Sequence, residues 1–512
     1  MPMTPTYPGV YIDELPSSVR TITGVPTSIA AFVGWAPRGP LDAFRITSWD
    51  DYHRVFGGLH VDSPMSIAVY QFYQNGGSEA EIVRLAGDGE PATIELNPGP
   101  KLEAASPGTW GQLLRVRVDH DTKDPSDSTL YNLTIKDTRT GVIERYLNVS
   151  SDLTAPRALE NVLQSSDLVA VAGDADKRPA KHANPAGGED PFEDGHDSGA
   201  GAWYTQAAGG SDDSELTKDD YLGDSSATGL YKLSKTDIFN MLCLPGLRQL
   251  TADIDDVQDG ALRLCVERRA MFIVDPPTTW TSVQDATQTH DLTGESTKNA
   301  AIYFPDIRAS NPTKSGVIEN FPPCGVIAGV WARTDVQRGV WKAPAGTDAS
   351  LNGIDGLALT MTDRENGLLN PLGVNCLRTF PVLGPVSWGA RTMRGADRLA
   401  DQWKYLPVRR LTLFIEESLY RGTQWVVFEP NDEPLWSSIR LNVGAFMNNL
   451  FRQGAFQGRT PQEAYLVKCD GTNNPQNDID QGIVNILVGF APLKPAEFVI
   501  IHIQQLAGQI QV

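Results

Sequence analysis

Residues 29–35 read Ile-Ala-Ala-Phe-Val-Gly-Trp, a continuously apolar run that two nearby prolines end. A strand buried on both faces of a parallel sheet has this composition. Ser63 then precedes Pro64, which matches a helix N-cap followed by proline in the first turn. Gly76–Gly77 would end that helix, and Glu81–Leu85 reads as the next strand. A strand, a helix and a strand in this order predict an α/β unit.

The same alternation returns further along the chain. Val257, Ala261 and Leu264 fall on one helical face, and Ala270–Val274 and Ala300–Phe304 read as buried strands. Two more helices are predicted later, over Leu411–Tyr420 and Trp436–Phe451. We therefore expect a mixed α/β (α+β) protein of several domains, in agreement with a length of 512 residues.

The region between these parts has a different texture. Short alternating segments over 113–118, 130–135 and 142–149 predict a β-rich module. Residues 173–224 hold thirteen acidic and four basic side chains, almost half of the chain's net charge of -20. Such a stretch is typical of a mobile, solvated loop.

Both ends of the chain read as extended arms. Repeated prolines prevent a helix within residues 1–25, and apolar residues of strand type fill Glu497–Val512. Strands this short have no core of their own, so we expect them to pair with another sheet. The predicted subunit-interaction residues are Val19, Thr21, Thr23 and Val25 in the first arm, and Phe498, Ile500, Ile501, Ile503, Leu506, Ile510 and Val512 in the second.

Composition limits the possible functions. A net charge of -20 would repel a phosphate backbone, so nucleic acid is not an expected partner. The start shows no secretory signal, and no apolar run is long enough to insert into a membrane. The five cysteines are scattered without a CxxC pair, as expected of free thiols in a reducing cytoplasm.

The sequence lacks the usual motifs of catalysis. It has no Walker-type phosphate loop, no GxGxxG, no HExxH and no GxSxG. Asp470–Asp480 is rich in Asp and Asn without the EF-hand spacing, so we expect a turn and not a calcium site. A serine hydrolase is the enzyme alternative, but His290 lacks the small neighbours of a subtilase histidine, and no Gly-Thr pair is followed by serine. We expect no enzyme activity, no cofactor and no metal.

Several blocks of the chain, in the right order, resemble contractile tail sheath proteins. The resemblance covers about residues 7–85 and 234–506, whereas 90–230 match nothing in that family. The matching blocks are YPGVYIDE (7–14), GVPTS (24–28), FVG (32–34), FPPCG (321–325), AGVWARTD (328–335), RGVWKAPA (338–345), LGVN (372–375), WGARTM (388–393), FEPND (428–432), GAF (454–456), VKCD (467–470) and PAEF (495–498).

The resemblance implies a domain arrangement. An inner domain would combine the first compact region with the C-terminal third, around a middle domain that is subtilisin-like in shape but not catalytic, with an outer β-rich insertion. The expected segments are the N-terminal arm 1–25, the inner domain 26–89 and 376–493, the insertion 90–232, the middle domain 233–375 and the C-terminal strand-donating arm 494–512.

The resemblance also implies a function. Sheath subunits polymerise helically around an inner tube, in rings expected to be hexameric, and contract to drive the tube through a target envelope. The implied partners are further copies of the chain, the inner tube, and baseplate and cap proteins. Assembly would occur in the bacterial cytoplasm, within a phage tail or a tail-like injection particle. A surface adhesin or another structural filament protein is the alternative that the acidic β-rich insertion leaves open.

The helices in the domain that the family places inward offer candidates for the contact with the tube. They carry charges of the kind found at solvent-exposed positions. The tube-facing candidates are Glu416, Glu417, Arg440 and Arg452.

Overall fold

The computed structural model describes residues 20–500 apart from 186, 198–200, 224–227 and 289–291. The chain forms two compact units. The large unit comprises Ser28–Val336 and Pro344–Lys404, and the small unit comprises Met1–Thr27, Gln337–Ala343 and Tyr405–Val512. Within the described residues, no helix is both long enough and apolar enough to cross a membrane.

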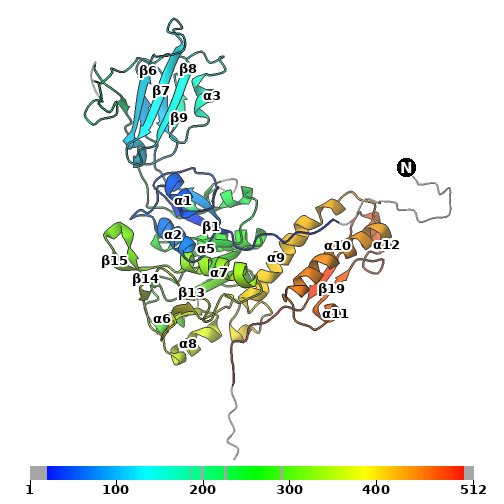
Figure 1. The fold of residues 1–512 in the computed structure, drawn as a ribbon. Helices are drawn as coiled ribbons and strands as arrows, with labels where there is room; N and C mark the ends of the chain where they lie inside the picture. The colour runs from blue at the N-terminus through cyan, green and yellow to red at the C-terminus, as the bar shows by residue number, and fades with distance from the viewer. Residues whose placement is uncertain (1–19, 186, 198–200, 224–227, 289–291, 501–512) are drawn as a thin grey trace, which may run out of the picture. The chain divides into compact units, whose positions relative to one another are not determined.

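An eight-stranded sheet organises the large unit (Figure 1). Its strand order is β18-β17-β13-β12-β11-β1-β3-β2; the six inner strands run parallel, and β2 and β18 are antiparallel to their neighbours. The strands are β1 (Ala30–Trp35), β2 (Phe44–Ile46), β3 (Ala80–Leu85), β11 (Met241–Cys243), β12 (Met271–Val274), β13 (Ala300–Phe304), β17 (Asn375–Phe380) and β18 (Gly384–Ser387). The predicted mixed α/β fold is confirmed.

Helix α2 (Pro64–Gln74) begins where the sequence predicts. The hydroxyl of Ser63 accepts a hydrogen bond from the backbone N–H of Ser66 at 3.1 Å, with Pro64 in the first turn. The remaining helices and hairpin strands of the unit are α1 (Trp49–Phe56), α5 (Ile254–Glu267), α6 (Val283–Ala286), α7 (Cys324–Arg338, whose last two residues belong to the small unit), α8 (Asp363–Leu369), β14 (Ile307–Asn311), β15 (Val317–Phe321) and β16 (Gly356–Leu357).

One expected grouping differs from the structure. Residues 26–89 were expected to join 376–493, but β1 pairs with β11 and with β3 inside the eight-stranded sheet. The physical reason is that every residue of β1 and β3 is buried, as expected of inner strands covered on both faces, and the eight-stranded sheet provides these positions. The other expected boundaries stay predictions.

The insertion has its own apolar core, built between two small sheets. Its elements are β4 (Thr93–Glu95), β5 (Lys101–Ala104), β6 (Leu114–Asp119), β7 (Leu130–Asp137), β8 (Ile143–Ser150), α3 (Leu159–Leu163), β9 (Val169–Gly173) and β10 (Thr205–Gln206). Its two ends lie together, because the N–H of Glu90 donates to the carbonyl of Ser211 at 3.2 Å and the N–H of Ser211 donates to that of Glu90 at 3.0 Å. We call these two hydrogen-bonded segments, at Glu90 and at Ser211, the neck. Beyond it, α4 (Lys218–Leu222) packs on α5 and so belongs to the α/β part.

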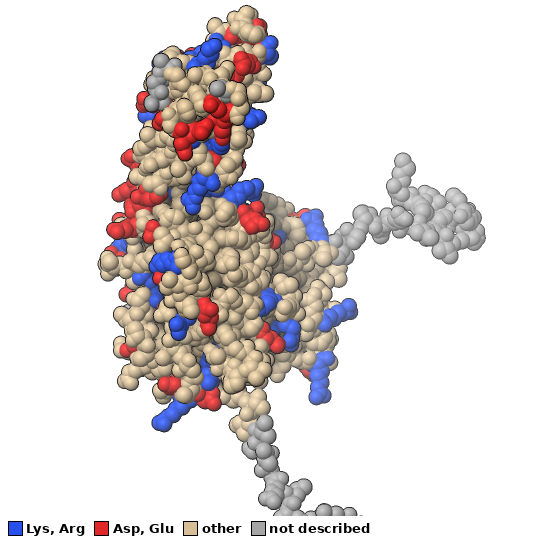
Figure 2. Space-filling view, turned by 60° about the vertical axis from the view of Figure 1, so that its left-hand side comes forward, with Lys and Arg blue, Asp and Glu red and all other residues tan. Residues whose placement is uncertain are grey.

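The acidic stretch differs from the solvated loop that its composition predicts. Three cationic side chains on β6 and β7 hold its described part against the sheet. Lys136 pairs with Asp190 at 2.8 Å, and Arg115 pairs with Asp194. Arg117 donates to the carbonyls of Ala183 and Trp203, both at 2.8 Å. Acidic side chains are nevertheless frequent on the visible face of the insertion, the upper lobe in Figure 2.

Two long helices and a small sheet form the small unit. They are α9 (Leu406–Gly422), α10 (Glu433–Arg452), α11 (Pro461–Ala464), β19 (Tyr465–Lys468), α12 (Gln476–Asp480) and β20 (Leu487–Phe490). Both predicted helices, over Leu411–Tyr420 and Trp436–Phe451, are confirmed, and their apolar faces form one core cluster.

Candidate functional site

The two-stranded sheet β19–β20 is the first feature that could bind another chain. Its strands are antiparallel, with Tyr465 opposite Phe490 and Lys468 opposite Leu487. One face, formed by Tyr465, Val467, Val488 and Phe490, packs on the core of the small unit. On the other face, Leu466 and Leu487 are 54% and 53% exposed. Among the described residues no third strand pairs with either β19 or β20.

An isolated pair of strands is a marginal structure with two rows of unpaired backbone groups. Here the sheet is held in place by α10 and by a network of asparagines in its connecting loop. Asn474 accepts from the N–H of Asn485 at 2.6 Å, and the side chain of Asn473 donates to the carbonyl of Asn485 at 2.8 Å. The side chains of this loop and α10 thus fix a sheet that, within the described residues, has only two strands.

The same loop contains the Asp-rich stretch that the sequence offered as a weak calcium candidate. The carboxylate of Asp470 accepts from the N–H of Thr472 at 2.8 Å and from its hydroxyl at 2.6 Å, which is the hydrogen bonding of a turn. Over the residues that the structure describes, no three His, Cys, Asp or Glu side chains are grouped so that they could hold a metal ion. We therefore assign this loop a structural role: its side chains hold the turn that joins β19 to β20.

The N-terminal arm is described from Arg20 onward, so Val19 lies outside the described residues. Thr21 and Thr23 are exposed and Val25 is half-buried, whereas Ile22 on the opposite side is buried in the core of the small unit. Burial does not follow the alternation predicted for a strand, because Arg20 and Gly24 are exposed like Thr21 and Thr23, and no strand is assigned over 20–27.

The C-terminal arm is described only to Ile500. Phe498 and Ile500 are 73% and 77% exposed, and 494–500 contain no assigned strand. The other candidate residues of this arm, Ile501, Ile503, Leu506, Ile510 and Val512, lie outside the described residues. The structure thus places an open sheet and an exposed apolar segment in one unit without joining them.

Three of the four tube-facing candidates form ion pairs within the chain. Glu417 pairs with Arg421 at 2.7 Å, and Arg440 pairs with Glu433 at 2.5 Å. Glu416 lies 3.7 Å from Arg409 and is exposed, and Arg452 is exposed at the end of α10. Glu416 and Arg452 therefore remain the more accessible pair.

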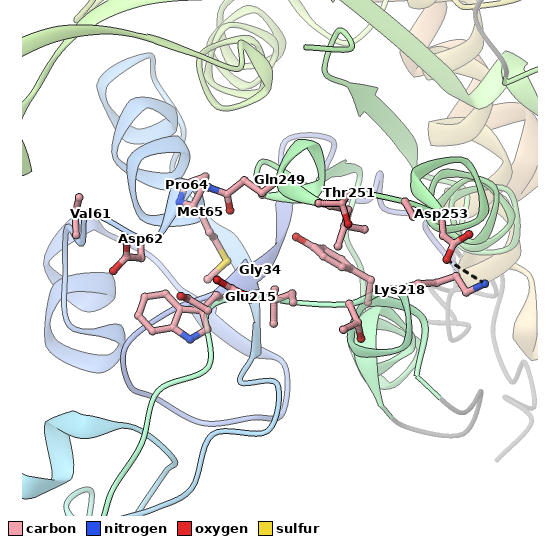
Figure 3. A pocket seen from close by; sticks show the side chains of 18 residues that line it. Gly34, Val61, Asp62, Pro64, Met65, Glu215, Lys218, Gln249, Thr251 and Asp253 are labelled. Carbon is pink, nitrogen blue, oxygen red and sulfur yellow. Dashed lines mark ion pairs between the residues drawn. The ribbon is translucent and has the colours of Figure 1, made fainter. Parts of the chain in front are cut away.

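A cavity of about 700 Å³ lies at the carboxyl ends of β1 and β11, where the strand order reverses direction. Open α/β sheets commonly bind ligands at such a point. Trp35, Met65 and Tyr221 are among its lining residues, and Lys218 and Asp253 form an ion pair of 3.8 Å at one end (Figure 3). The lining includes no histidine or cysteine, so it holds no pair of a base and a thiol nucleophile.

Asp275 is a carboxyl group with a strongly raised pKa at the end of a strand of the large sheet, and the sequence did not single it out. It follows β12 directly, and its Oδ1 accepts from the N–H of Cys324 at 2.9 Å, at the start of α7. Burial raises the pKa of Asp275 to about 7, although the bond from Cys324 and the charge of Arg248 act in the opposite direction. The carboxyl group thus caps a buried helix. His290, considered for a hydrolase, lies outside the described residues.

Comparisons with known proteins assign the family. The model of the phage tail sheath protein central domain matches residues 215–393, and that of the phage tail sheath C-terminal domain matches 400–505, together more than half of the chain. The chain belongs to the phage tail sheath family. Tail sheath proteins of Vibrio phage KVP40 and Salmonella phage ViI are each 28% identical to it, over 182 and 176 residues. These matches span 35% and 34% of this chain and 26% of each relative.

Solved sheath structures share the fold over nearly the whole chain. The sheath complex of the extracellular contractile injection system PVC, in the contracted state, has a TM-score of 0.57 at 22% identity and covers 99% of both chains. The sheath tail protein of Listeria innocua has a TM-score of 0.61 at 13% identity, covering 92% of this chain and 96% of that one. The contracted helical sheath of the anti-feeding prophage has a TM-score of 0.58 at 22% identity, covering 98% and 100%.

The open sheet is the feature of this sheath-family chain that reasoning from the sequence missed. The signal was present, because short apolar runs, 465–467 and 486–488, lie on either side of a turn-rich loop. That loop was considered only for calcium binding.

Proposed function

We propose that this chain is the sheath subunit of a contractile tail machine, which polymerises helically around an inner tube and contracts to drive the tube through a target envelope. The family assignment supports the class of machine. The open β19–β20 sheet, with Leu466 and Leu487 exposed, is the single observation that carries the mechanism of assembly.

In this proposal the arms of neighbouring copies complete the sheet. The arms before residue 20 and over 494–512 supply strands, since 20–27 bind α9 and α10 of their own subunit, and β19 and β20 each offer an edge. Burying one large apolar side chain contributes about 1.5–3 kcal/mol, so several of them offset the ordering of a short strand. A subunit that donates to one neighbour and accepts from another makes head-to-tail contacts, which build helical arrays and not closed dimers.

The proposal extends to the partners and the place of assembly. The chain would form rings of six copies in the bacterial cytoplasm, with the inner tube inside and baseplate and cap proteins at the ends. Its role is mechanical and requires no catalysis or cofactor. The insertion would face outward.

Electron microscopy of the purified protein tests this proposal. We expect hollow tubes with a cogwheel cross-section from the full-length chain, and soluble subunits with unchanged circular dichroism after deletion of 494–512. Contractile tubes from the truncated protein would contradict strand donation by this arm. A full-length protein that never forms tubes, alone or with its tube protein, would contradict the sheath function itself.

A further inference from the structure

The segment Arg20–Thr27, which we call the strap, lies along α9 and α10. Three buried polar side chains bind its backbone: Asn442 accepts from the N–H of Arg20 at 3.0 Å, Ser418 accepts from the N–H of Val25 at 3.2 Å, and Arg410 donates to the carbonyl of Thr27 at 3.1 Å. Because the strap meets Arg410 near its end and Ser418 earlier, it runs antiparallel to α9. A segment with no strand partner thus has its backbone held by side chains.

A notch in α9 holds the strap at its centre. Ile22 is 6% exposed and belongs to the core cluster of the small unit. It packs so closely on Gly422 that a Cβ atom added there would lie 2.5 Å from the Cγ2 atom of Ile22. Only glycine leaves room for this contact.

Two aromatic side chains also contact the strap. The guanidinium of Arg20 lies over the ring of Trp425, 4.9 Å from its centroid. Gly24 passes so close to Phe414 that an added Cβ atom would be 2.8 Å from the ring. The strap therefore makes close side-chain contacts at Arg20, Ile22 and Gly24, in addition to its three backbone hydrogen bonds.

We propose that the strap is an anchor, which fixes the point where the N-terminal arm leaves its own subunit and takes up the pull on that arm. Since β1 begins three residues after Thr27, a pull on the preceding residues would reach the eight-stranded sheet directly if the strap were not bound. With the strap bound, the pull ends in α9 and α10. The part of this inference that concerns load rests on the proposed sheath function, whereas the anchoring itself does not.

Limited trypsin digestion of the monomer tests the anchor. Arg20 is the first basic residue of the chain, so cleavage after it removes only the first twenty residues and is read by mass. A bound extended strap resists cleavage, and release exposes the Arg20–Thr21 bond. We expect Gly422→Ala to accelerate this cleavage at least tenfold.

Gly444→Ala is the matched control. Gly444 lies in α10, and an added Cβ atom there meets nothing within 4 Å. Both substitutions replace a helical glycine by alanine and so stabilise the helix to a similar degree. The two variants differ only in that the new methyl group at 422 fills the space occupied by Ile22. Equal cleavage rates in the two variants and in the unmodified protein would overturn the anchor.

A second pair removes the strap's own contribution. Ile22→Ser deletes the buried side chain, and Thr23→Ser alters an exposed one. We expect rapid cleavage in the first and unchanged cleavage in the second, with equal circular dichroism. In assembled tubes, Gly422→Ala should leave assembly intact but fragment the sheath on contraction; intact contracted sheaths would overturn the load-bearing role and leave the sheath function standing.

Discussion

The eight-stranded sheet and the β19–β20 sheet differ in how their edges are treated. At one end of the large sheet, residues 346–351 cover β18: Gly346 donates to the carbonyl of Ser387 at 2.9 Å, and Ser387 donates to that of Ala349 at 2.9 Å. At its other end β2 is only three residues long. In the small sheet, whose strands have four residues each, no further strand pairs with β19 or β20 among the described residues.

Proteins normally cover or shorten a sheet edge, because unpaired N–H and C=O groups recruit other chains. This chain does so in the unit that forms its main core and does not in the unit that holds both arms. From this difference we infer that the large sheet is complete in one copy, whereas other copies would complete the small sheet in the assembly proposed above. The following experiments test that distinction.

The largest effect is expected from a charge on the open sheet. Leu466→Asp places a carboxylate on the exposed face of β19 and should abolish tube formation, because an added strand would bury it. Leu147→Asp in β8 is a matched control, since Leu147 is similarly exposed at 57%. Negative-stain microscopy and sedimentation would measure both. Tubes at the usual yield from Leu466→Asp would show that this sheet accepts no strand.

The neck predicts how much of the insertion can be removed without harming the complete sheet. Replacing 91–210 by a short Gly-Ser linker should leave a folded subunit and thinner tubes, because Glu90 and Ser211 already lie together. Replacing 90–230 also removes Tyr221 and Leu230, which are buried, and should cost several kcal/mol of stability. Thermal unfolding distinguishes the two deletions. Equal melting temperatures would contradict this boundary.

A smaller effect, on the stability of the large unit, is expected when the pH is changed. The pKa of Asp275 is raised to about 7 in the folded chain, so the folded state binds a proton that the unfolded state has lost. Stability should therefore fall as pH rises from about 4 to about 7, by a few kcal/mol at most. Asp275→Asn should remove this dependence in thermal unfolding at pH 5.5 and 7.5. A dependence retained in the variant would assign it to other groups.

The smallest effect is expected at the proposed tube-facing surface. Glu416→Lys and Arg452→Glu should weaken capture of the tube protein a few-fold at low salt while leaving self-assembly intact, as for rim charges. Arg452→Glu is the cleaner of the two, because Glu416→Lys also breaks the pair with Arg409. Reversal of Glu417 or Arg440 would likewise break the pairs with Arg421 and Glu433. Glu160→Lys, on α3 of the insertion, is the control. Capture that is unchanged in both variants would count against this surface.

Sequence patterns predicted the buried strands and the capped helices well, because each pattern depends on a few neighbouring residues. The apolar run of β1 and the Ser63 cap of α2 are examples. The strand order was not predictable in this way. β11 follows β3 after an insertion of more than a hundred residues, yet it pairs with β1, and no local pattern encodes that pairing.

The candidate site was predicted only in part, for a related reason. Exposed apolar residues in the arms can be read from composition, but the acceptor depends on which strands lack a partner, and this is a property of the whole fold. Ile22 was not among the predicted interaction residues of the first arm, yet it is the residue of this segment that packs closely on Gly422. Its partner, Gly422, is four hundred residues away in the sequence.

The two hydrogen bonds between Glu90 and Ser211 also affect how readily the insertion can be exchanged during evolution. A domain whose ends leave the host side by side can be exchanged in a single genetic event, since the host must close only a very short gap and loses little chain entropy in doing so. Selection can then vary this lobe in response to the surroundings of the particle, while the parts that move during contraction stay under separate constraint. For engineering, the same pair of residues marks the position at which a foreign domain could be displayed on every subunit.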